Sequence, residues 1–175
     1  MSRRIGLGII GRLSLAAALG GCSGALSLGA PVASYGASNA FSPAGYGQTM
    51  IDDMHFKVTA TGTEATPKQR VEKIARARAA QIGVDQKLEY FKVTSVQHGF
   101  TCEKRQEGYK SSATPAASNP TVVLDVVYAK DAADPTFLSS ADAYQTLSGE
   151  LAGEVVAPDA KAAAVQETRA GCGQG

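Results

Sequence analysis

The 175-residue sequence is short of the side chains on which catalytic and metal sites depend. It has no tryptophan, two histidines and three cysteines, and aromatic residues make up only 6% of it. Because a metal site needs three or more clustered ligands, the two histidines, His55 and His98, do not point to one, and no metal or other cofactor is expected. The sequence also contains no G-x-S-x-G nucleophile elbow, phosphate-binding loop or dinucleotide-binding motif. We therefore expect that the protein is not an enzyme.

Acidic residues are absent from the start of the chain. All 16 Asp and Glu residues follow Cys22, whereas three of the 17 Lys and Arg residues (Arg3, Arg4 and Arg12) precede it. Without the segment before Cys22, 14 basic residues stand against 16 acidic ones, a net charge of −2. Such a chain has no general attraction for nucleic acid, and we expect no nucleic-acid partner.

Residues 1–21 have the anatomy of a signal peptide. A basic start is followed by an acid-free, apolar run from Ile5 to Leu19, which is too short and interrupted for a stable membrane span. The segment ends in Leu19-Gly20-Gly21-Cys22, which resembles the bacterial lipobox of an aliphatic residue, two small residues and a cysteine. This resemblance implies cleavage before Cys22 and attachment of diacylglycerol to its thiol, with acylation of the new amino terminus.

A lipid on Cys22 would make the membrane the first partner of the mature chain, since each buried methylene group adds roughly 0.8 kcal/mol. Ser23 follows the cysteine. An Asp at that place is the usual signal for retention in the inner membrane, so the resemblance favours the outer membrane, facing the periplasm. Two alternatives stay open: an ordinary secretory signal with a chance cysteine, and a twin-arginine signal around Ser2-Arg3-Arg4.

The mature chain is expected to have three parts. Residues 22–49 are rich in Gly, Ala and Ser without apolar periodicity, which predicts a flexible tether carrying the lipid. Residues 50–152 contain the periodic segments of a small domain. Residues 153–175 are rich in Ala and Gly and predict a loose tail.

Within the domain, alternating or β-branched segments predict strands at 54–61, 90–96 and 121–128, the last of them central because both its faces are apolar. A helix is predicted over 67–82, between a Thr66 N-cap and Gly83, and a weaker one over 139–152. This order favours an α+β fold, with one sheet of three to four strands and one main helix packed across one face.

Arg78 falls in the middle of the apolar face of the first predicted helix, among Ile74, Ala75 and Ile82. A guanidinium there must reach water or find an acceptor. We favour a structural arginine, with Asp125 of the third strand as the candidate partner. The alternative is an anion-binding arginine in a groove beside the sheet.

Four other cations, Lys68, Arg70, Lys73 and Arg76, crowd the first half of the same helix. Such a cluster is usually a solvated face. The alternative is contact with anionic lipid or lipopolysaccharide.

The two cysteines other than Cys22 are Cys102 and Cys172. In an oxidising compartment, a single disulfide between them is the simplest expectation. Two free thiols or an intermolecular bond are the alternatives.

A further resemblance rests on several short motifs, which are Gly45-Tyr46-Gly47, Phe56-Lys57-Val58, Gly62, Thr66, Arg78-Ala79-Ala80 and Tyr90-Phe91. Together they resemble the CC0125/CC1285 family of small proteobacterial lipoproteins over residues 45–98. This chain departs from the family at Thr63, where an Asn is common, and it lacks the usual aromatic residue before Arg78. The family has no established activity, so the resemblance implies a fold and a location in the cell envelope but no chemistry.

The expected function is that of an envelope lipoprotein acting as a non-catalytic binding or assembly module, with other envelope proteins as further partners. The alternative is an envelope hydrolase acting on cell wall or lipid. No feature of the sequence specifies an oligomeric state.

Overall fold

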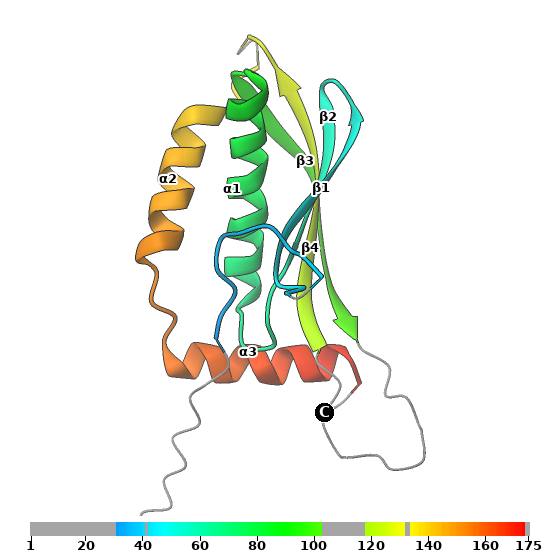
Figure 1. Cartoon of the computed structure of the whole chain (residues 1–175), viewed down its shortest axis with the longest axis vertical. Helices are drawn as coiled ribbons and strands as arrows, with labels where there is room; N and C mark the ends of the chain where they lie inside the picture. Colours follow the sequence, from blue (N-terminus) through cyan, green and yellow to red (C-terminus); the bar gives the residue numbers. More distant parts are fainter. Residues whose placement is uncertain (1–30, 41, 103–117, 132–133, 174–175) are drawn as a thin grey trace, which may run out of the picture.

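A computed structural model describes residues 31–40, 42–102, 118–131 and 134–173, which form an α+β fold (Figure 1). The strands are β1 (Gly45–Asp52), β2 (His55–Thr61), β3 (Tyr90–Cys102), β4 (Ser118–Ala129) and β5 (Leu138–Ser139). They form one antiparallel sheet in the order β1-β2-β4-β3-β5. The helices are α1 (Lys68–Gln86), α2 (Ser140–Gly153) and α3 (Pro158–Gly171). The predicted fold class is confirmed, with five strands in place of three to four and three helices in place of one main helix.

Strand β4 is the middle of the sheet, as its composition predicts. Val122, Leu124 and Val126 are at most 2% exposed and form the core beneath α1. The alternate residues, among them Val123 and Asp125, are partly exposed on the opposite face. Alternation of side chains along a strand thus gives this sheet one packed face and one hydrated face.

Helix α1 lies between the sheet and α2 and is therefore buried on two sides (Figure 1). Its sheet-facing residues include Val71 and Ile74, both 0% exposed. Ala77, Ala80 and Gly83 recur every three residues along another side of the helix and are also buried. Small residues there let α2 approach closely.

Gly83 does not end the helix, contrary to the prediction. Helix α1 continues to Gln86, and Lys87 adopts the left-handed conformation (φ 57°) that closes it. The glycine is needed for packing, because a Cβ at this position would lie 2.6 Å from the Cβ of Ser140 and 2.9 Å from the carbonyl oxygen of Leu88. The close contact with Ser140 and Leu88 therefore explains why residue 83 is a glycine, and a role in ending the helix does not.

Replacing Gly83 by alanine is expected to destabilise the protein by about 1–3 kcal/mol, although alanine has the higher helix propensity by about 1 kcal/mol. The matched control is Gly149→Ala in α2, where nothing lies within 4 Å of the added carbon and where stability should rise by about 0.5–1 kcal/mol. Urea unfolding of the two variants checks both signs. A stabilised Gly83→Ala protein would contradict the close approach of α2.

Two segments that were expected to be loose contain ordered chain. Strand β1 begins at Gly45, and residues 31–40 contact the domain, so the predicted tether over 22–49 includes ordered chain. The predicted loose tail over 153–175 contains α3, in which Ala164 and Thr168 are 5% and 1% exposed. In both segments, contacts with distant parts of the chain supply the order that local periodicity did not indicate.

Candidate functional site

The chain enters the domain through residues 31–40, which we call the strap. The hydroxyl of Thr63 donates to the carbonyl oxygen of Pro31 (2.7 Å), and the amide of Ala33 donates to the hydroxyl of Thr66 (2.9 Å). Arg70 Nε donates to the carbonyl oxygen of Ala33 (3.0 Å). Ala33 is buried, with 3% of its surface exposed. Thr66, which was predicted to be a helix cap, therefore secures the strap to the turn before α1.

The second half of the strap crosses α1 and joins β1 to α2. The ring of Tyr35 lies 5.0 Å from that of Tyr46 in β1 and 6.4 Å from that of Tyr144 in α2. Its hydroxyl donates to Gln81 Oε1 of α1 (2.6 Å). Backbone hydrogen bonds then join Gly36 and Ser38 to Tyr46. One aromatic side chain thus contacts all three layers.

Burial raises the pKa of the Tyr35 phenol well above its ordinary value, and the neighbouring phenols of Tyr46 and Tyr144 raise it further. Burial likewise raises the pKa of Tyr128, whose hydroxyl donates to the carbonyl oxygen of Ala79 (2.7 Å). Both side chains are therefore held in their neutral form while the domain is folded.

Stability is expected to fall as the pH rises above about 10, because unfolded tyrosines release protons there while Tyr35 and Tyr128 in the folded state do not. Thermal melts at increasing pH, with absorbance of the phenolate, check this result. The variant Tyr35→Phe should lose about 1 kcal/mol at neutral pH and show a shallower decline at alkaline pH. Phenolate absorbance of both tyrosines in the folded protein near pH 10 would contradict the prediction.

Arg78 lies at the edge of the sheet, and its side chain is 15% exposed. Nε donates to Gln48 Oε1 (2.6 Å), and Nη1 donates to Gln81 Oε1 (2.7 Å) and Asp85 Oδ2 (3.3 Å). The guanidinium also lies over the ring of Tyr46, 5.0 Å from its centroid. These contacts support the structural role, because the guanidinium is engaged by side chains of α1 and β1.

The predicted partner of Arg78 is wrong. Asp125 lies on the hydrated face of the sheet, where its carboxylate is 3.6 Å from Lys57 Nζ of β2. Alternation along β4 places it opposite the face that α1 covers, so the two charges cannot meet.

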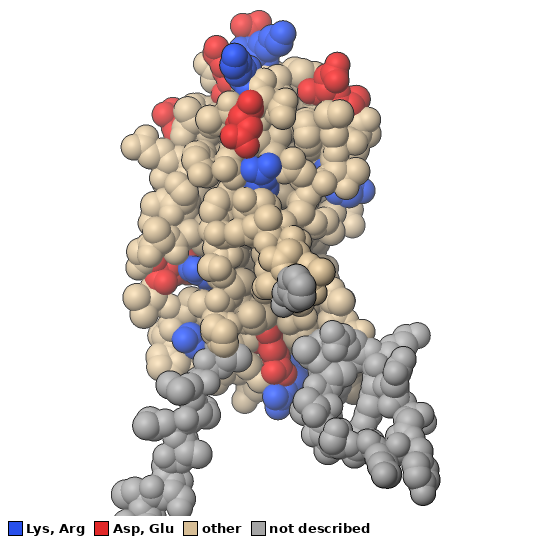
Figure 2. Space-filling model, viewed as in Figure 1, with Lys and Arg blue, Asp and Glu red and all other residues tan. Residues whose placement is uncertain are grey.

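Each of the four cations in the first half of α1 faces a carboxylate. The pairs are Arg70–Glu154 (2.8 Å), Lys68–Glu167 (2.7 Å), Lys73–Glu150 (3.1 Å) and Arg76–Glu72 (2.7 Å). Figure 2 likewise shows Lys and Arg interspersed with Asp and Glu, with no broad patch of one sign on this face. The pairing weakens the alternative of contact with anionic lipid through these residues. It also identifies Arg70, only 6% exposed, as the buried arginine that sequence periodicity assigned to Arg78.

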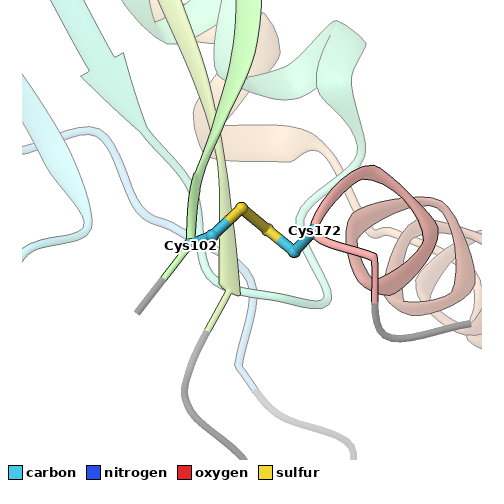
Figure 3. The surroundings of a disulfide bond; sticks show 2 residues. All are labelled: Cys102 and Cys172. Atoms are coloured by element: carbon cyan, nitrogen blue, oxygen red, sulfur yellow. A yellow bond between two sulfur atoms is a disulfide. The ribbon is translucent and has the colours of Figure 1, made fainter. Parts of the chain in front are cut away.

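A disulfide joins Cys102 at the end of β3 to Cys172 after α3 (Figure 3), which is the pair expected from the sequence. The two Cα atoms are 5.6 Å apart. Next to it, Gly171 lies against the ring of Phe100, leaving no space for a Cβ. The bridge fixes α3 across the end of the sheet.

Both histidines are paired with carboxylates. His55 Nδ1 is 2.7 Å from Asp52, and His98 Nε2 is 3.2 Å from Glu72. Among the described residues, no three His, Cys, Asp or Glu side chains gather as metal ligands would.

A cavity of about 300 Å³ lies where the end of α1 meets the start of α2. Its hydroxyl groups have structural partners, since Ser140 donates to the carbonyl oxygen of Leu88 (2.8 Å) and Ser139 caps α2 by accepting from the amide of Asp142 (3.3 Å). Val84, which is 44% exposed, lies at its border. The recess is of mixed character, since Lys87, Glu89 and Tyr90 line it together with Leu88 and the serines.

The lipobox residues Leu19, Gly20, Gly21 and Cys22 lie outside the described residues. None of the helices in the described part of the chain is long and apolar enough to cross a membrane. Searches of protein-family models, curated proteins and solved structures found nothing that matches this chain.

Proposed function

We propose that this chain is a lipid-anchored envelope protein whose α+β domain is a non-catalytic binding or assembly module. The observation that carries the proposal is the disulfide between Cys102 and Cys172. Structural disulfides belong to oxidising compartments, and the lipobox ending in Cys22 implies the same compartment. Ser23 after the cysteine favours the outer membrane, with the domain in the periplasm.

The arrangement of charged groups supports a binding module over an enzyme. His55 and His98 each pair with a carboxylate, and Arg70 and Arg78 support the strap and the sheet edge. Catalysis usually requires titratable groups that converge on a cleft. The cavity has Lys87, Glu89 and Tyr90 in its lining, but its serine hydroxyls, the candidate nucleophiles, bond to backbone groups.

Labelling with a clickable palmitate analogue tests the anchor. The parent chain should take up label, and Cys22→Ala should not. Cys102→Ser is the matched control, since it also removes one cysteine and should label like the parent. Label that persists in Cys22→Ala refutes the anchor.

Incubation of the purified protein with peptidoglycan and with phospholipid vesicles tests the module. No soluble glycopeptide and no fatty acid should be released. Release of either, lost on mutation of Ser140 or Glu89 at the cavity, would favour the hydrolase instead.

A further inference from the structure

We propose that the lipid anchor holds the domain upright on the bilayer, with α3 against the lipid headgroups and the tip of the β1–β2 hairpin directed away. The inference rests on the proposed lipid attachment at Cys22. It concerns which surface of the domain faces the membrane.

The strap is bound at the end of the domain that α3 covers. Pro31 and Ala33 are hydrogen-bonded to Thr63 and Thr66, in the turn between β2 and α1. Helix α3 crosses the same end of the domain (Figure 1). It is held there by ion pairs of Arg169 with Glu64 (2.6 Å) and of Glu167 with Lys68 (2.7 Å). The chain coming from Cys22 thus enters the domain beside α3.

The connection between Cys22 and the strap is short. Nine peptide units separate Cys22 from Pro31, so the segment spans at most about 30 Å. The 19 residues of α1 run from this end of the domain to the other over about 28 Å. With the hairpin tip on the bilayer, the connection would therefore have to be extended almost to its full reach.

The two ends of the domain differ in the side chains that they expose. At the α3 end, Ala162, Ala163 and Gln166 are exposed and uncharged, and Val155 in the connection before α3 is 92% exposed. The charged side chains Glu167 and Arg169 of α3 are engaged by other parts of the domain. Asp159 and Lys161 carry the other charges of α3, so this side meets the hydrated headgroups and does not enter the hydrocarbon.

The opposite end presents exposed aliphatic side chains to the periplasm. Met50 and Ile51 of β1 are 63% and 61% exposed, and Leu138 of β5 is 51% exposed. The cavity beside Val84 opens at this end as well. An upright domain holds these groups away from the lipid, where a protein partner can reach them.

The absence of tryptophan from the sequence provides the test, because one introduced tryptophan is a unique fluorescent donor. We place it at Ala163→Trp in α3 and, as the matched position, at Ile51→Trp in the hairpin. Each lipidated protein is inserted into phosphatidylethanolamine–phosphatidylglycerol vesicles that contain a dansyl headgroup lipid. Energy transfer from position 163 should be several-fold stronger than from position 51, and equal or reversed transfer would overturn the orientation.

Two controls separate this inference from the anchor itself. Both tryptophan variants are also made with Cys22→Ala, which should abolish transfer from either position. Absence of palmitate label in the parent means that the proposed anchor has failed. Label together with equal transfer means that only the orientation has failed. If Ala163→Trp melts at a lower temperature than the parent, Gln166→Trp on the same exposed side of α3 replaces it.

Discussion

Replacing Cys102 and Cys172 together by serine is expected to lower the free energy of unfolding by about 4 kcal/mol. The bridge joins residues 70 positions apart, and a loop of that size restricts the unfolded chain by about this amount in the chain-entropy model. Urea unfolding measures the loss, with the variants made in a Cys22→Ala background that removes the third cysteine and with it the proposed site of lipid attachment.

The same substitution should loosen α3 before the rest of the domain. Besides the bridge, α3 is held mainly by buried Ala164 and Thr168 and by its ion pairs with Glu64 and Lys68. Hydrogen exchange should therefore quicken in α3 more than in α1 or β4. Reducing agent should reproduce the loss in the parent and leave the double variant unchanged. Undiminished stability of the double variant would contradict a structural role for the bridge.

The second large effect is expected at Arg70. Its guanidinium donates to the carboxylate of Glu154 (2.8 Å) and to the carbonyl oxygens of Ala33 (3.0 Å) and Leu151 (3.4 Å). Arg70→Met keeps most of the packing volume but leaves the buried carbonyl oxygens of Ala33 and Leu151 without this donor, whereas Glu154 keeps its ion pair with Lys73 (3.3 Å). Each buried acceptor left unsatisfied costs about 1–3 kcal/mol, and we expect a total loss of about 3 kcal/mol.

Arg78→Met is the matched comparison in the same helix. Its partners Gln48 and Asp85 are exposed and can bond to water when the guanidinium is lost. We expect a loss of about 1 kcal/mol, within the range for a net hydrogen bond. Thermal melts of the two variants rank the arginines, and a larger loss at Arg78 would show that Arg70 is not the buried one.

The two arginines illustrate what the sequence could and could not predict. Periodicity correctly placed Val71 and Ile74 on the sheet-facing side of α1, and it placed Arg78 among them. It could not predict that α2 and the strap cover another side of the helix, because those contacts join residues far apart in the chain. Arg70 seemed solvated for that reason, although it is 6% exposed.

The sequence of α3 contains residues that favour helix ends, but its Ala- and Gly-rich composition led to the prediction of a loose tail. Pro158 and Asp159 lie in the first turn and Arg169 lies in the last turn. Proline and an acid at the start and a base at the end are the residues that stabilise helix ends. The alanines between them lack a strong apolar stripe. The disulfide and two buried small residues position the helix. The sequence favoured this disulfide but did not connect it with a helix in the C-terminal segment.

The central strand was predictable because the residues of β4 are apolar on both faces. Strand β1 has no such pattern, and it is defined by pairing with β2 and by the strap against Tyr46. Arg78 and its partner Gln48 therefore lie at an edge that the sequence did not reveal.

The strap also determines where a pull on the proposed lipid anchor would act. Its hydrogen bonds to Thr63 and Thr66 lie ahead of its contact with Tyr46 along the chain, so tension would enter at the turn before α1 and not at the edge strand. Because α1 is held by the sheet on one side and by α2 on the other, the load would divide between both layers. Strand β1 would bear little of it, and the sheet would be spared unzipping from its edge.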